Sequence, residues 1–240
     1  MRTLLVVLTA ICCFTPLAAQ CTDGEDLAYR AYVTNSTADY AAAVAATQQL
    51  PATAENHFTL ASLAHQAATM TMVSENTDEL ERYLDLTEQA IDDLWELDAE
   101  HPGAHGLYSG YLGLRIAQTP MKGMIYGSKA AKYARTGVEL GPDDPVANYF
   151  LGSNLFYTPE EWGGNKKAAL AALKTAAANL PAESSACDWM ALQILTLYGQ
   201  AQAKMGDKDG ARTTYLRALA AEPDLNYVKY DLLPRLDKEK

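Results

Sequence analysis

Tyrosines and a few polar side chains, spaced along three predicted helices, are the residues of this chain that could carry a binding chemistry. Phenol and guanidinium groups combine apolar area with hydrogen bonding, so Tyr and Arg are favoured anchors for a partner. Together they would form an aromatic groove with one cation, suited to an extended peptide or a partner helix. In the alternative interpretation, several of these tyrosines fill the core between helices. The candidates are Tyr111, Arg115, Tyr149, Ser153, Tyr157 and Gln200.

Residue patterns for catalysis or metal binding are missing from the sequence. His57 and His65 are about two helical turns apart, too far to share a metal on one helix face. His101 and His105 stand on either side of a Pro-Gly pair, so no helix sets their geometry. The sequence has no paired metal-ligand motif, nucleophile elbow or phosphate loop. We therefore expect no catalytic residue, no metal site and no cofactor, and a protein that is not an enzyme.

A loop with a single tryptophan interrupts the fourth pair of predicted helices. Pro159 and Gly163-Gly164 exclude helix between Thr158 and Asn165, and Trp162 lies at the tip of this loop. Trp162 would either contact a partner or fold back over the neighbouring helices as an apolar lid.

Five pairs of antiparallel helices must position these candidates. Prolines recur about every 40 to 50 residues directly after a predicted helix, which a proline cannot continue. Apolar residues recur at three and four positions, alanine is abundant, and no strand pattern is present. The predicted pairs are Asp23–Val33 with Ala38–Leu50, Glu55–Val73 with Asp78–Ala99, Ala104–Gln118 with Lys122–Leu140, Pro145–Tyr157 with Lys166–Leu180, and Cys187–Met205 with Asp207–Ala221.

The fifth pair has the most regular spacing. Gly199 and Ala211 are small where the two helices must approach, and Tyr215 fills the gap to the next unit. The pattern resembles the tetratricopeptide repeat (TPR), except that Gln202 stands where an aromatic residue is usual. The complete pattern is Leu195-x3-Gly199-x2-Gln202-x8-Ala211-x3-Tyr215-x2-Ala218-x4-Pro223.

The resemblance implies an all-α, right-handed α-solenoid that ends in a capping helix over residues 225–237. In TPR proteins the first helix of each pair lines the concave groove. When Gly110 and Gly152 are aligned with Gly199, the six candidates point into that groove. Residues 145–225, with their Gly-Gly loop, also resemble secreted bacterial TPR proteins, including the T-component associated with TRAP transporters.

The N-terminus indicates export. Residues 1–19 have the positive start, apolar stretch and small residues of a signal peptide, which leaves one domain over residues 20–240. No other apolar stretch is long enough to span a membrane. A lipoprotein signal places a small residue before its cysteine, so Gln20 argues against a lipid anchor at Cys21. We expect a periplasmic or secreted protein.

The net charge narrows the class of partner, and the cysteine positions bear on disulfide bonding. The formal net charge is −11 and becomes −12 when Arg2 leaves with the signal peptide, which disfavours nucleic acid as a partner. Cys21 and Cys187 stand at opposite ends of the array, tens of Å apart if the helix layers stack at ~10 Å each. A disulfide needs Cα atoms within about 7 Å, so we expect both cysteines to be unpaired.

These observations predict an exported, non-catalytic scaffold that binds a protein or peptide in its concave groove. The candidate site consists of the six groove residues and Trp162. One alternative is an accessory component of a solute-uptake system of the TRAP type that binds a small ligand. Another is a structural or oligomerising module, and the sequence leaves self-association open.

Overall fold

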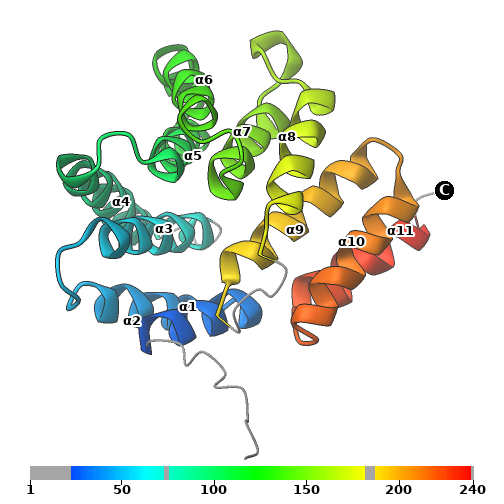
Figure 1. Ribbon diagram of the computed structural model, residues 1–240, viewed down its shortest axis with the longest axis horizontal. Helices are drawn as coiled ribbons and strands as arrows, with labels where there is room; N and C mark the ends of the chain where they lie inside the picture. Colours follow the sequence, from blue (N-terminus) through cyan, green and yellow to red (C-terminus); the bar gives the residue numbers. More distant parts are fainter. Residues whose placement is uncertain (1–22, 73–75, 182–186, 239–240) are drawn as a thin grey trace, which may run out of the picture.

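The computed structural model describes residues 23–72, 76–181 and 187–238. Throughout these residues the chain is helical, and no strand is present in them (Figure 1). The helices are α1 (Asp23–Thr34), α2 (Thr37–Thr47), α3 (Ala54–Thr71), α4 (Thr77–Leu97), α5 (Pro102–Gln118), α6 (Gly123–Leu140), α7 (Pro145–Tyr157), α8 (Lys166–Ala178), α9 (Trp189–Lys204), α10 (Lys208–Ala221) and α11 (Leu233–Lys238), with short turns of helix at η1 (Pro120–Lys122), η2 (Glu160–Trp162) and η3 (Val228–Leu232).

Short polar side chains begin most of these helices. Ser36, Thr53 and Asn165 each accept a hydrogen bond from the backbone N–H three residues later, as an N-cap does. The sequence predicts an N-cap within the turn over residues 34–37, and the structure places it at Ser36. Pro102 and Pro145 occupy the first helical position, where a missing N–H costs nothing.

Consecutive helices pack as five antiparallel pairs, which confirms the all-α, TPR-like solenoid predicted from the sequence. The second helix of a pair ends earlier than predicted in three cases: α2 at Thr47, α4 at Leu97 and α8 at Ala178. Neighbouring pairs contact mainly through their first helices and through the second helix of one pair with the first of the next.

The regular fifth pair shows why its residue types recur. The ring of Tyr215 lies directly against Gly199, where any side chain would collide with it, and Tyr215 is 1% exposed. Gln202, which replaces the usual aromatic residue, is also buried. Its side-chain oxygen accepts a hydrogen bond of 2.6 Å from the hydroxyl of Thr214. A satisfied polar pair thus takes the place of an aromatic contact at this position.

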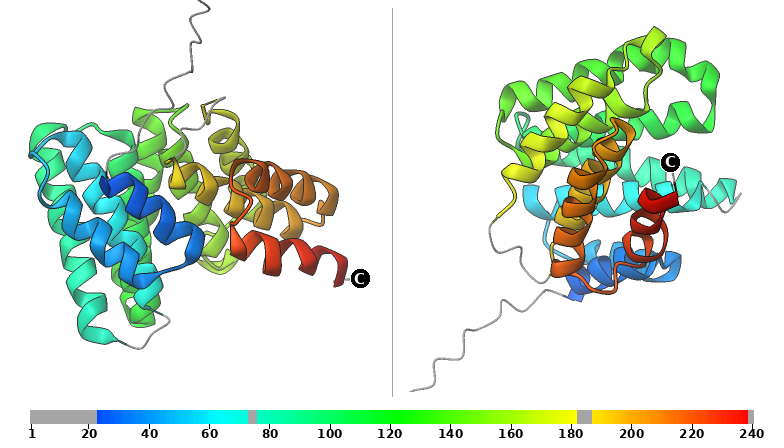
Figure 2. Two further views of the ribbon diagram at one scale, coloured as in Figure 1. Left: turned by 90° about the horizontal axis from the view of Figure 1, so that it is seen from below. Right: turned by 90° about the vertical axis from the view of Figure 1, so that its right-hand side faces the viewer.

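The C-terminal cap differs in detail from the predicted helix over residues 225–237. The chain first forms the wide π turn η3 and then the short helix α11, which lies along α10 (Figure 2). Leucine and valine recur at helical spacing in this segment, which predicts an apolar face, and this face is buried. Its members are Leu225, Val228, Leu232 and Leu236.

The array curls until its first pair meets its last, so α1 contacts α9 (Figure 1). The hydroxyl of Tyr29 donates a hydrogen bond of 2.9 Å to Glu222 at the end of α10. The rings of Tyr32 and Trp189 have their centroids 6.0 Å apart. The helix pairs are numbered here as units 1 to 5 in chain order. Unit 1 (α1 and α2) is therefore packed against unit 5 (α9 and α10) as well as against unit 2 (α3 and α4).

This closure overturns the expectation for the cysteines. Cys187, which directly precedes α9, is disulfide-bonded. Cys12, Cys13 and Cys21 lie outside the described residues. The expectation of unpaired cysteines assumed that the two ends of the array lie tens of Å apart, whereas the curvature brings α1 to α9.

In the described residues, no helix is both long enough and apolar enough to cross a membrane.

Candidate functional site

Four tyrosines from three distant segments gather where the array closes; they are called here the tyrosine cluster. Tyr32 belongs to α1, Tyr149 and Tyr157 to α7, and Tyr227 precedes η3. The hydroxyl of Tyr32 lies 3.4 Å from Thr196 on α9, and Gln200 on the same helix donates a hydrogen bond of 3.1 Å to the hydroxyl of Tyr227.

The phenols of Tyr32, Tyr149 and Tyr157 have raised pKa values and are neutral at physiological pH. Burial raises the pKa of Tyr32 and of Tyr149 far above the ordinary value, and neighbouring phenols of the cluster raise both further. Burial and the neighbouring Tyr227 likewise raise the pKa of Tyr157. A neutral phenol can donate and accept a hydrogen bond, so the cluster offers hydrogen bonding without charge.

The hydroxyl of Tyr149 has no hydrogen-bond partner among the described residues, although the side chain is 8% exposed. Its ring packs edge-on against Phe150, with centroids 5.0 Å apart. The hydroxyl itself is not among the buried polar atoms that lack a partner, so it keeps contact with solvent and can bond to water. The neighbouring Tyr157 is 65% exposed, and Tyr227, which neighbours Tyr157, is 49% exposed.

The structure brings together part of the predicted site. Tyr149 and Tyr157 belong to the tyrosine cluster, and Gln200 contacts it through Tyr227. Ser153 is half-buried on α7, one helical turn from each of the two tyrosines. Sequence reasoning missed Tyr32 and Tyr227, because only the closure of the array brings their segments to α7 and α9.

Tyr111 and Arg115 lie elsewhere, against α4. The hydroxyl of Tyr111 donates a hydrogen bond of 2.7 Å to Glu88, and Arg115 donates one of 3.1 Å to the Tyr111 oxygen. Arg115 also pairs with Glu81 and with Asp85 on the same helix. These five residues form what is called here the α4–α5 network.

Ion pairs and hydrogen bonds within this network engage its charged groups. Hydrogen bonds from Gln118 and from Arg115 lower the pKa of Glu81. The Arg115 side chain is 12% exposed, so its guanidinium is engaged by α4 and not presented to a partner. The two predicted groove residues of unit 3 therefore hold units 2 and 3 together.

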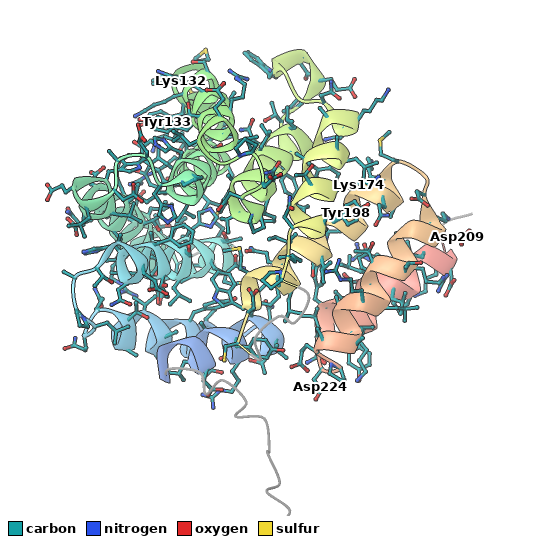
Figure 3. All side chains as sticks on the ribbon, in the orientation of Figure 1. Lys132, Tyr133, Lys174, Tyr198, Asp209 and Asp224 are labelled. Carbon is teal, nitrogen blue, oxygen red and sulfur yellow. The ribbon has the colours of Figure 1, made fainter. Side chains whose placement is uncertain are left out.

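A second group of aromatic rings continues this region on its outer side. Trp95 stacks on Tyr133, which is labelled in Figure 3, with ring centroids 5.7 Å apart. Tyr108 meets Tyr133 edge-on at 4.7 Å, and the ammonium of Lys129 lies 5.0 Å above the Tyr108 ring. A cation–π contact thus occupies these rings within the protein itself.

Exposed apolar side chains gather at the edge formed by the connections between the helices of units 3 and 4. Met121, Met124 and Ile125 are 75%, 73% and 70% exposed around the start of α6. Trp162, in the corresponding connection of unit 4, is 70% exposed and does not form a lid. An open hollow of about 390 Å³ adjoins this loop. It is lined by Glu160, Gly164, Asn165, Lys166, Lys167 and Met205.

No group of three or more potential metal ligands occurs in the part of the chain that the structure describes. His65 is buried on α3, where its ring meets Phe150 edge-on at 5.5 Å. Burial lowers the pKa of this imidazole to about 4, so it is neutral at pH 7.

Known structures share this fold at low sequence identity. The HusA haemophore from Porphyromonas gingivalis matches with a TM-score of 0.60 at 19% identity, over 75% of this chain and 92% of that chain. A thermophilic TPR protein from Thermus thermophilus matches with a TM-score of 0.54 at 17% identity, over 89% of this chain and 96% of that chain. No family model and no curated protein matches the sequence. These similarities establish a TPR-like helical repeat and lend no support to a link with TRAP transporters.

Proposed function

We propose that this protein is an exported, non-catalytic binding module that recognises a protein or peptide partner at the tyrosine cluster. The observation that carries the proposal is the hydroxyl of Tyr149, which has no partner among the described residues and keeps contact with solvent near the exposed Tyr157. Such a group can exchange a water molecule for a partner's acceptor, and the aromatic side chains around it supply contact area. The raised pKa of these phenols makes them poor bases and nucleophiles, which favours binding over catalysis.

Partner capture from the envelope fraction of the source organism tests this proposal. The wild-type protein is compared with the double variant Tyr149→Phe/Tyr157→Ala, and Tyr230→Ala serves as the matched control. Tyr230 is 69% exposed but lies beneath Lys229, outside the cluster. We expect the double variant to lose partners that the control retains. If both variants retain the same partners, the site is wrongly assigned.

A small planar ligand is the second candidate, and the fold shared with a haemophore favours it. The tyrosine rings could stack on such a molecule. In this candidate mode, stacking of the porphyrin plane on the exposed tyrosine rings would supply most of the contact. Absorbance titrations with haem and with iron-free protoporphyrin should then give similar affinities, both reduced by Tyr157→Ala. If neither porphyrin binds, this candidate is excluded.

A further inference from the structure

The tyrosine cluster presents hydrogen-bond donors without any charge to pair with an ionic group. Every contact that the structure gives its four members is with an uncharged side chain, among them Thr196, Phe156 and Gln200. A charged ligand group would lose its hydration there without gaining a counter-charge. Resting on the function proposed above, we infer that the partner segment is uncharged, rich in proline and extended as a polyproline II helix.

The fold excludes the other common modes of peptide recognition. Strand addition needs an open sheet edge, and the described chain is helical with its backbone groups bonded within helices. Recognition of acidic or phosphorylated motifs needs arginines at the binding surface, and the contacts that the structure gives the tyrosine cluster include no arginine. A partner helix needs an apolar groove, whereas this surface carries hydroxyl and amide groups. Recognition of polyproline by aromatic side chains remains.

Hydrogen bonding at the cluster matches a proline-rich chain. Proline has no backbone N–H, and a polyproline II helix leaves its carbonyl groups free, so the segment offers acceptors only. The Tyr149 hydroxyl is available as a donor. Gln200 already donates to the oxygen of Tyr227, which leaves the proton of that hydroxyl free to donate. Two donors therefore face a segment that presents acceptors.

Aromatic faces beside these donors provide the area that proline rings need. Tyr157 and Tyr227 of the cluster are exposed, and Trp162 is exposed on the loop that directly follows α7. Rigid aromatic rings and a pre-extended peptide both lose little conformational freedom on binding. The arrangement thus favours a short proline-rich segment over a flexible polar one.

Isothermal titration calorimetry of the whole mature protein tests the inference. The probe is an end-capped, uncharged decamer in which proline alternates with alanine, and the comparison decamer carries glycine in place of proline. We expect the proline peptide to bind at least about tenfold more tightly, because the glycine chain must be ordered first. Its affinity should change less than about twofold between 50 and 500 mM salt, since no ion pair forms.

Two variants assign this binding to the cluster. Tyr149→Phe removes only the hydroxyl and should weaken binding about fivefold, the effect of one buried hydrogen bond. Tyr157→Ala removes an exposed ring and should weaken it about tenfold. Tyr230→Ala should leave binding unchanged, and circular dichroism checks that all three variants are folded.

Each outcome decides the inference. It is overturned if the glycine peptide or a charged decamer binds as tightly as the proline peptide, or if Tyr149→Phe and Tyr157→Ala behave like Tyr230→Ala. A native partner that is lost in Tyr149→Phe/Tyr157→Ala, yet not displaced by the proline peptide, rejects the inference and leaves the proposed function standing. Loss of neither native partner nor peptide in that variant rejects both.

Discussion

Units 3 and 4 place different residues at the same repeat positions, one and five residues after the glycine that aligns with Gly199. In unit 3 these are Tyr111 and Arg115, and in unit 4 they are Ser153 and Tyr157. The first two are bound to carboxylates of α4, whereas Tyr157 is 65% exposed. Equal positions in the repeat therefore do not imply equal roles.

The helix that precedes each unit explains this difference. Along its sequence α4 presents Glu81, Asp85 and Glu88, which stand three to four residues apart on one face. That acidic face binds the phenol and guanidinium of unit 3. The repeat position fixes the place of a side chain on its own helix, and the charges on the neighbouring helix determine which groups it contacts.

The close packing of unit 3 against its neighbours can be disrupted at Gly110. A Cβ atom there would lie 2.6 Å from Phe150 and 2.9 Å from His65, so Gly110→Leu should lower the free energy of unfolding by about 3 kcal/mol or more. Urea unfolding followed by circular dichroism measures the change. Gly113→Leu is the matched control on the same helix, because nothing lies within 4 Å of its Cβ position. The control should gain about 0.5 kcal/mol from helix propensity. Equal losses would show that the close contact is unimportant.

Acid should lower the stability of the packing around His65 on α3 and leave binding at the tyrosine cluster unchanged near neutral pH. His65 has a pKa of about 4 in the folded protein and about 6.5 in the unfolded chain. Between these values only the unfolded chain binds the proton, so stability should fall by about 2–3 kcal/mol as the pH drops from 6.5 to 4. His65→Met should lack this part of the pH dependence, as measured by urea unfolding across that range. Peptide binding at the neutral tyrosine cluster should stay constant between pH 6 and 8, and a change there would contradict its neutral character.

Removing the cation of the α4–α5 network should loosen unit 3 without affecting unit 4. Arg115→Met leaves Glu81, Asp85 and Tyr111 without their shared donor and should cost about 2 kcal/mol in thermal or urea unfolding. Arg135→Met, at an exposed position of α6, should cost less than about 0.5 kcal/mol. A folded Arg115→Met protein that no longer binds the partner would place this network in the binding site after all.

The smallest change is expected at Trp162. Because the side chain is 70% exposed, Trp162→Ala should alter the free energy of unfolding by less than about 0.5 kcal/mol. Trp189→Ala, at a ring that is 8% exposed between α1 and α9, should cost about 3–5 kcal/mol. If the two substitutions cost the same, Trp162 packs as a lid and unit 4 is less open than described.

Local sequence signals were sufficient to predict the fold. Proline positions, caps such as Ser36, and small residues such as Gly199 each act within one or two neighbouring helices. The paired arrangement and the buried face of the cap followed from them. The ends of α2 and α8 were less predictable, because these helices stop at Thr47 and Ala178, a few residues before the prolines Pro51 and Pro181 that mark their predicted ends.

The candidate site was only partly predictable, because it depends on contacts between distant segments. Small rotations between successive pairs add up along the array, and their sum, which brings Tyr32 and Tyr227 to α7, is not written in any local pattern. The disulfide of Cys187 was missed for the same reason. The contacts of Tyr111 and Arg115 with α4 were not predicted, because their positions were read without the charges of that helix.

The contact between α1 and α9 changes how the molecule should come apart. In an open repeat array each unit touches only its neighbours, so the terminal units fray first and unfolding proceeds piecewise. Here Tyr29 is bonded to Glu222, a residue 193 positions later in the chain, so the first and last units protect each other. Such long-range contacts slow folding and make it more cooperative. The intact chain should therefore unfold in one transition. Deleting the last pair of helices would expose the first pair.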